Sequence, residues 1–177
     1  MILVLNGYPG TGKLTIAQAL APMLGARLLD IHTTHNLAFA LTEFRSDAFY
    51  KTVDRVEAMA FGLIRDLPRD VPVVLTTVLA GDGARALAEW EKLAALGRDR
   101  PPFLVVHIAC DLEENLRRVN GESRVGARKP RDPGYVRRNH AEAKPLMRAG
   151  AERVLELDTT GLSAEASAAA ITDWARG

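Results

Sequence analysis

Short apolar runs alternate with longer segments of helical period along this chain. Runs rich in β-branched residues predict strands at 2–5, 27–29, 73–77, 103–108 and 154–157, because a strand covered on both faces is apolar at nearly every position. Apolar residues spaced three and four apart predict helices, of which the clearest are 14–24, 47–66, 84–95, 112–119, 135–149 and 164–175. This alternation is typical of an α/β fold built round a mostly parallel sheet.

The size and composition of the chain are those of an ordinary globular protein. It has 177 residues, of which 47% are hydrophobic and 25% charged, and this excludes collagen-like, disordered and disulfide-scaffold proteins. A chain of this length normally forms one domain. We therefore expect a single domain over residues 1–177, interrupted by an insertion at about 120–134.

The sequence also indicates the cellular compartment in which the protein works. Cys110 is the single cysteine, so it cannot form an internal disulfide, and nothing indicates an oxidising environment. The N-terminal apolar run meets Asn6 and Gly7 before a signal peptide could form. No apolar stretch approaches the length of roughly 20 residues that spans a bilayer. We expect a cytoplasmic protein without a membrane partner.

Charge is distributed unevenly. Residues 117–138 carry eight basic and two acidic residues, a net charge of +6, which leaves −5 for the rest of a chain whose total is +1. Gly and Pro interrupt this stretch, so it reads as a long loop between helices, and such loops are commonly functional. Nucleic-acid binding would need interleaved aromatic residues, and only Tyr135 is present. We expect a small polyanionic ligand here, with a solvated basic loop as the alternative.

The most specific motif is a phosphate-binding loop. Residues 7–13 read GYPGTGK, which matches the G-x4-G-K core of a Walker A loop between a strand and a helix. Glycines let backbone N–H groups surround phosphate oxygens, the helix N-terminus adds positive charge, and the lysine reaches the outer phosphates. A structural Gly-rich turn is the alternative. The expected ATP-binding residues in this region are Gly7, Pro9, Gly10, Thr11, Gly12, Lys13, Leu14 and Thr15.

Two positions depart from the usual magnesium chemistry of this loop. Leu14 stands where Ser or Thr would place a hydroxyl on Mg²⁺, and Thr76 and Thr77 end the third strand where an aspartate is common. A leucine cannot ligate a cation that requires oxygen. Switch GTPases and motor ATPases are thereby disfavoured. We expect Mg²⁺ to be held mainly by phosphates and water, without a direct protein ligand.

On these residues the chain resembles the small P-loop kinases, a group that includes nucleoside monophosphate, shikimate and gluconate kinases and the chloramphenicol phosphotransferase type. Nucleoside monophosphate kinases read GKGT where this chain reads GKLT. The resemblance covers the order of elements along nearly the whole chain, but only residues 7–15 form a specific motif. It implies a three-layer fold with a five-stranded parallel sheet in the order 2-3-1-4-5. It also implies an acceptor bound beyond strand 2 and a basic lid over the triphosphate.

The expected acceptor site follows the second strand. Asp30 and His32 resemble the Asp-x-Asp pair of shikimate kinase, and a carboxylate there could accept the acceptor proton or hold a magnesium-bound water. The alternative is that Asp30 only caps the following helix. His32 and His35 are candidates for hydrogen bonds to the acceptor. They lack the further ligands that a zinc site needs.

The resemblance also assigns roles to the basic segment and to the last strand-to-helix loop. Arg118 and Arg124 resemble an arginine that stacks on adenine and one that reaches the γ-phosphate, with Arg117 as a rival for the first role. Gly161 lies in a loop that resembles the one beside the adenine ring. An ordinary connection capped by Ser163 is the alternative.

Together these features predict an ATP-dependent phosphotransferase acting on a small-molecule acceptor. Lys13, Asp30 and Arg124 are the expected catalytic residues, and Arg118 and Gly161 are expected to bind the nucleotide. The alternative function is an ATP-binding regulatory protein or weak NTPase without a dedicated acceptor, because Leu14 removes the usual metal-binding hydroxyl.

Overall fold

The computed structural model describes residues 1–120 and 132–177. Five parallel strands form one sheet in the order β2-β3-β1-β4-β5, as expected. The strands are β1 (Ile2–Asn6), β2 (Arg27–Asp30), β3 (Val73–Thr77), β4 (Phe103–Ala109) and β5 (Arg153–Asp158). The helices are α1 (Lys13–Leu24), α2 (Ile31–Leu41), α3 (Asp47–Asp66), α4 (Ala84–Asp99), α5 (Leu112–Asn120), α6 (Pro133–Ala141) and α7 (Ala164–Arg176).

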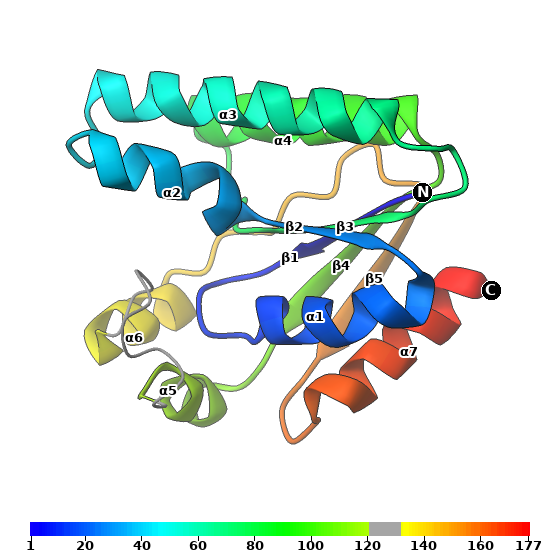
Figure 1. The fold of residues 1–177 in the computed structure, drawn as a ribbon. Helices are drawn as coiled ribbons and strands as arrows, with labels where there is room; N and C mark the ends of the chain where they lie inside the picture. The colour runs from blue at the N-terminus through cyan, green and yellow to red at the C-terminus, as the bar shows by residue number, and fades with distance from the viewer. Residues whose placement is uncertain (121–131) are drawn as a thin grey trace.

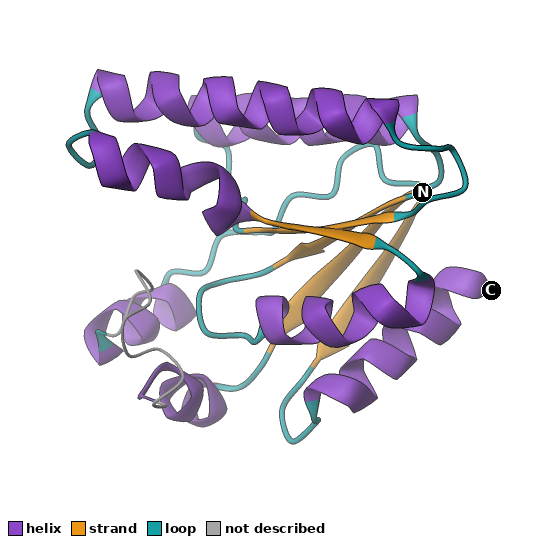
Figure 2. Cartoon of the chain, viewed as in Figure 1, coloured by secondary structure: helices purple, strands orange, loops and turns teal. Residues whose placement is uncertain are grey.

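Helices cover both faces of the sheet (Figures 1 and 2). On one face the alternate strand residues Ile2, Val4 and Val105 pack against α3 and α4. On the other face Leu3 and Leu5 pack against α1 and α7. Coverage on both sides explains why the strands are apolar at successive positions rather than alternating. No helix within the described ranges is long and apolar enough to cross a membrane.

The strand register brings the polar strand ends to one edge of the sheet. Asn6, the last residue of β1, pairs with Thr77 of β3 and His107 of β4. Asp30, the last residue of β2, pairs with Thr76. Because ligands in open α/β sheets bind beyond the carboxyl ends of the strands, this edge is where a site should form.

Helix α2 was missing from the predicted helices. It begins directly after β2 at Ile31 and runs to Leu41, although its first turn holds His32 and two threonines, which are weak helix formers. Packing overrides that local preference, because Ala38 of α2 joins Phe49 and Val53 of α3 in a small core. The polar residues after β2 are therefore presented from a helix.

The predicted helix at 135–149 was too long. Helix α6 ends at Ala141, and the chain then runs alongside the loop that follows β3. Met147 N–H donates to Leu79 O at 3.0 Å, Gly81 N–H donates to Pro145 O at 2.9 Å, and Ala80 and Leu146 form an antiparallel bridge. Pro145 has no N–H to continue a helix, so the segment is held by pairing instead.

The buried side chain of Asn6 joins three segments beneath the edge of the sheet. Its Nδ2 group donates to Leu79 O at 2.8 Å and to Met147 O at 3.2 Å, and its Oδ1 accepts from Leu79 N–H at 2.9 Å. Asn6 is fully buried. The last residue of the central strand therefore fixes both the 78–81 loop and the 142–149 segment.

We expect Asn6→Ala to lower the free energy of unfolding by about 2–4 kcal/mol, because it removes three buried hydrogen bonds and leaves Leu79 N–H without its partner. Urea unfolding at neutral pH measures this. The matched control is Asn36→Ala, the same change on the exposed side of α2, which should stay within about 0.5 kcal/mol of the wild type. Equal effects of the two variants would contradict the structural role of Asn6.

Candidate active site

The loop between β1 and α1 depends on glycine where α5 approaches it. Gly10 has φ 94°, and a Cβ atom added there would lie 2.1 Å from Asn115 Oδ1 and 2.7 Å from Val119 Cγ2. Gly12 precedes α1 with φ 91° and provides no side-chain cap for its first turn. The N–H groups of that turn are thus left to a ligand, and a helix N-terminus favours an anion.

Polar contacts within the loop hold its curvature. Lys13 Nζ donates to Gly7 O at 2.6 Å and to Tyr8 O at 2.9 Å. Thr11 is buried, and its hydroxyl donates to Tyr8 O at 3.0 Å. The ammonium group of Lys13 therefore lies within the arc of the loop, where it is close to any phosphate that the loop surrounds.

Tyr8 connects this loop to the segment after α6. Its hydroxyl donates to Lys144 O at 2.9 Å and accepts from Lys144 N–H at 2.7 Å. A hydroxyl can do both, because it carries one hydrogen and two lone pairs. The loop is thus tied to the 142–149 segment by two hydrogen bonds.

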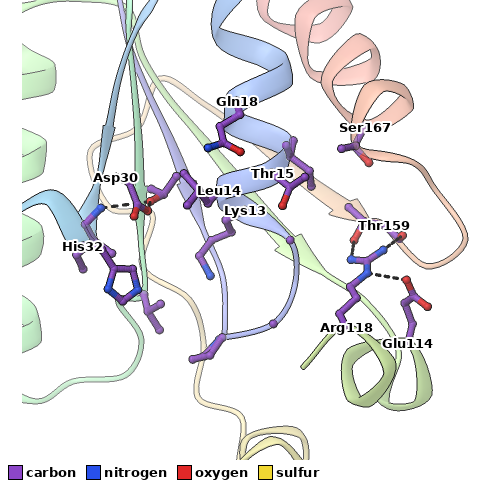
Figure 3. A pocket seen from close by; sticks show the side chains of 18 of the residues that line it. Lys13, Leu14, Thr15, Gln18, Asp30, His32, Glu114, Arg118, Thr159 and Ser167 are labelled. Carbon is purple, nitrogen blue, oxygen red and sulfur yellow. Dashed lines mark hydrogen bonds and ion pairs between the residues drawn. The ribbon is translucent and has the colours of Figure 1, made fainter. Parts of the chain in front are cut away.

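A cavity of about 1150 Å³ begins at this loop and continues past the end of β2. Figure 3 shows Lys13 between Asp30 and His32 on one side and Arg118 and Glu114 on the other. Predicted site residues that line this cavity are Pro9, Gly10, Gly12, Lys13, Leu14, Thr15, Asp30, His32, His35 and Arg118.

The remaining predicted site residues lie elsewhere. Gly7 does not line the cavity, because it packs against Ile108 O, which a Cβ atom would approach to 2.4 Å. Thr11 is buried behind the loop. Gly161 turns the chain with φ 71° beside the lining residues Thr159 and Leu162. Arg124 and most of the predicted insertion at 120–134 lie outside the described residues.

Asp30 occupies the N-cap position of α2 without capping it. The helix has no side-chain cap hydrogen bond there, so the capping alternative is wrong. Instead, Asp30 Oδ1 accepts a hydrogen bond from the Thr76 hydroxyl. Thr76 Oγ1 in turn accepts from Ile31 N–H at 3.4 Å. Thr76 therefore fixes one carboxylate oxygen of Asp30 and leaves the other available to the cavity.

His35 is held against its own helix. Its Nδ1 lies 3.0 Å from Ile31 O, and because a carbonyl oxygen can only accept, Nδ1 must carry the hydrogen. In the neutral ring this leaves Nε2 as a hydrogen-bond acceptor. The part of the chain that the structure describes contains no group of three or more His, Cys, Asp or Glu residues suited to a metal ion.

Arg118 braces the opposite side of the cavity. Its Nη1 donates to Thr11 O and to Thr159 Oγ1, both at 2.9 Å, and its Nη2 donates to Thr159 O at 2.8 Å. Its Nε donates to Glu114 Oε1 at 2.6 Å. The guanidinium edge thus joins the phosphate-binding loop, α5 and the loop after β5. In that last loop Ser163 caps α7 by accepting from Ala166 N–H at 3.1 Å, as its alternative interpretation predicted.

Glu114 is the acidic partner of this brace. Hydrogen bonds from Arg117, followed by those from Arg118, lower the pKa of its carboxyl from 4.5 to about 2, against the opposing effect of burial. Both arginines approach to 2.6 Å. Arg117 itself is exposed, whereas Arg118 is mostly covered. The brace is therefore an ion-paired unit at neutral pH.

Several lining residues were not predicted from the sequence. Thr76 was noticed only for the aspartate it replaces, and its contact with Asp30 follows from the β2–β3 register. Phe39 lies on α2, which the sequence did not predict, and Phe44 lies in the connection between α2 and α3. Other lining residues without a sequence signal are Gln18, Val78 and Ser167.

Comparison with known proteins identifies the family of this chain. The profile of a family described as an AAA domain matches residues 3–142. A shikimate kinase from Salinispora arenicola is 33% identical over 129 residues, which cover 73% of this chain and 69% of that protein. This chain belongs to the small P-loop kinases.

Solved structures show the same fold for this P-loop kinase. A protein from Chloroflexus aurantiacus, provisionally described as a kinase, superposes with a TM-score of 0.69 at 22% identity, covering 99% of this chain and 93% of that one. Shikimate kinase from Acinetobacter baumannii in complex with shikimate gives 0.62 at 20% identity, covering 99% and 92%. The order of strands expected from the resemblance is thus confirmed.

The kinase should tolerate a Cβ atom at Gly25 better than at Gly10. Both residues have positive φ, so alanine costs about 1–2 kcal/mol at either, but nothing lies within 4 Å of the added atom at Gly25. Gly10→Ala also meets Asn115 and Val119, which adds about 1–3 kcal/mol. Urea unfolding compares the two variants, and equal losses would refute the close approach of α5 to the loop.

The Glu114 brace predicts a pH dependence of stability. The folded-state pKa of about 2 lies below the ordinary 4.5, so the ionised form stabilises the fold above pH 4.5, and this contribution is lost as pH falls toward 2. Glu114→Gln should therefore destabilise the kinase clearly at pH 6 and less at pH 3. The control Glu113→Gln removes a charge from the same turn without breaking either ion pair. A pH-independent difference between wild type and Glu114→Gln would contradict the brace.

Proposed function

We propose that this protein is an ATP-dependent phosphotransferase that moves the γ-phosphate of ATP to a hydroxyl group of a small molecule. The observation that carries this proposal is one cavity that is lined by both Lys13 of the phosphate-binding loop and Asp30 at the end of β2. A donor phosphate and an acceptor can meet there without leaving the cavity. The shikimate kinase relatives act within the same class of reaction.

The end of the cavity at the phosphate-binding loop fits a nucleoside triphosphate. The uncapped first turn of α1 and the Lys13 ammonium would bind the phosphates, since both favour negative charge. Four of the five N–H groups of Arg118 donate to Thr11, Thr159 and Glu114. With most of the guanidinium edge engaged, its flat face suits stacking on an adenine ring better than its edge suits gripping phosphate oxygens.

The acceptor end fits a hydroxyl group beside Asp30. In the proposed transfer, the acceptor oxygen forms a bond to the γ-phosphorus while the bond from that phosphorus to the β,γ-bridging oxygen breaks. ADP leaves with the electron pair of the broken bond, and the hydroxyl proton passes to the second carboxylate oxygen of Asp30. Thr76 holds the first oxygen and so orients the carboxylate for that transfer.

Magnesium would be bound chiefly through the phosphates and water. Leu14 offers no oxygen, and the Glu114 carboxylate is committed to two arginines. Asp30 is the cavity-lining carboxylate on the acceptor side that could accept hydrogen bonds from a magnesium-bound water. When bound, Mg²⁺ supplies charge neutralisation at the phosphates. Arg124 remains the proposed second contact to the γ-phosphate.

Asp30→Asn separates binding from transfer. Asparagine retains an oxygen for the Thr76 hydroxyl but cannot take up a proton, so ATP affinity should persist while turnover falls by about 10²–10⁴. Lys13→Ala should instead abolish tight ATP binding. The matched control is Asp82→Asn, in the loop before α4 and outside the cavity lining, which should leave both properties unchanged.

Calorimetry with ATP and an ADP-release assay provide the two measurements. The acceptor panel contains nucleosides, sugars, shikimate-like acids and antibiotics. If none raises ADP release above the background hydrolysis rate, the kinase proposal fails, and a nucleotide-binding regulatory protein takes its place. Unreduced turnover of Asp30→Asn would remove Asp30 from the reaction.

A further inference from the structure

The two ends of the cavity differ sharply in chemistry. Lys13, Arg117 and Arg118 all lie at the end formed by the phosphate-binding loop and α5. Beyond Asp30 the lining changes to apolar and ring-bearing side chains. They are Ile31, His32, His35, Phe39, Phe44 and Val78. Among residues 1–120 and 132–177, no lysine or arginine lines this second end.

Four rings form a continuous cluster there. The centroids of Phe39 and Phe49 are 5.1 Å apart, those of Phe39 and Phe44 are 5.5 Å apart, and those of Phe44 and Phe49 are 5.4 Å apart. The His35 ring lies 6.2 Å from Phe39 and 6.1 Å from Phe49. These distances lie within the usual range for aromatic pairs. The cluster is therefore a preformed surface.

The rings of the cluster differ in exposure to solvent, from buried Phe49 to exposed Phe44. Phe49 is 2% exposed and does not line the cavity, whereas Phe44 is 58% exposed and does. The Arg45 guanidinium lies 5.1 Å from the centre of the Phe44 ring but is not part of the lining. Core packing accounts for Phe49. It does not account for Phe44, whose ring lies largely in water at the mouth of the cavity.

We propose that the acceptor is an uncharged alcohol carried on an apolar or aromatic ring, which packs against the surface formed by Phe39 and Phe44 while its hydroxyl turns toward Asp30. His35 Nε2 can accept one hydrogen bond from a polar substituent on that ring. The transfer step is the one given above, with the proton passing to Asp30. This inference rests on the proposed function and adds the class of substrate.

Apolar lining disfavours the acidic acceptors of related kinases. A carboxylate moved out of water needs a cation or several hydrogen-bond donors to replace its hydration. At this end of the cavity, the described residues offer ring faces, methyl groups and the imidazoles of His32 and His35, but no lysine or arginine. Shikimate, the molecule bound in the Acinetobacter baumannii structure, is thereby disfavoured relative to an uncharged ring alcohol.

The test compares ligands by saturation-transfer NMR in the presence of a non-hydrolysable ATP analogue. The probes are 2-phenylethanol and thymidine as ring-bearing alcohols, and shikimate and gluconate as acids. The variants are Phe44→Ala at the exposed rim and Phe39→Leu, which retains apolar bulk but removes the ring. Leu37→Ala is the control, because Leu37 is 48% exposed on α2 and does not line the cavity.

We expect the ring alcohols to bind more tightly than the acids. Phe44→Ala and Phe39→Leu should each weaken that binding by about 2- to 12-fold, as the loss of one aromatic contact implies, and Leu37→Ala should not change it. Tighter binding of shikimate or gluconate, or ring-alcohol binding that neither phenylalanine variant weakens, would overturn the inference.

Parallel ADP-release assays separate this inference from the kinase proposal. If a ring alcohol binds as described but no acceptor on the wider panel stimulates ADP release, the ring-binding surface stands and the phosphotransferase proposal fails. If an acid is phosphorylated and the ring alcohols are not, the phosphotransferase proposal stands and the ring-binding surface fails.

Discussion

The buried amide of Asn6 is the interaction on which the rest of the site depends. It ends the central strand and pairs with backbone groups of Leu79 and Met147, which come from two loops far along the chain. The phosphate-binding loop begins at the next residue. Because a buried polar group is costly to leave unpaired, these three segments are held in one arrangement. The phosphate-binding loop therefore starts from a fixed point at the centre of the sheet.

The sequence was most informative where one residue type is physically required. The GYPGTGK pattern predicted a tight loop between strand and helix, and Gly10 is indeed pressed against Asn115 and Val119. The strands were evident because burial on both faces requires continuous apolar runs. Helix α2 was not evident, since His32 and its neighbouring threonines have low helix propensity and tertiary packing on α3 decides its conformation.

Contacts between distant residues were the least predictable. Asp30 was singled out from its position after β2, but its hydrogen bond with Thr76 depends on the pairing of two strands separated by 46 positions. The engagement of Arg118 with Thr11 and Thr159 likewise joins residues 107 and 41 positions apart. No local pattern encodes such pairs, because each exists only after the sheet has formed. Arg117 and Arg118, at the start of the basic segment, do line the cavity.

The double hydrogen bond between Tyr8 and Lys144 has a mechanical consequence. The tyrosine hydroxyl both donates to and accepts from the backbone of the same residue. Moving the 142–149 segment away from the phosphate-binding loop therefore breaks both bonds together. Helix α6 ends only three residues before Lys144. Any displacement of α6 that pulls on the 142–149 segment must either detach Tyr8 or carry the phosphate-binding loop along with it.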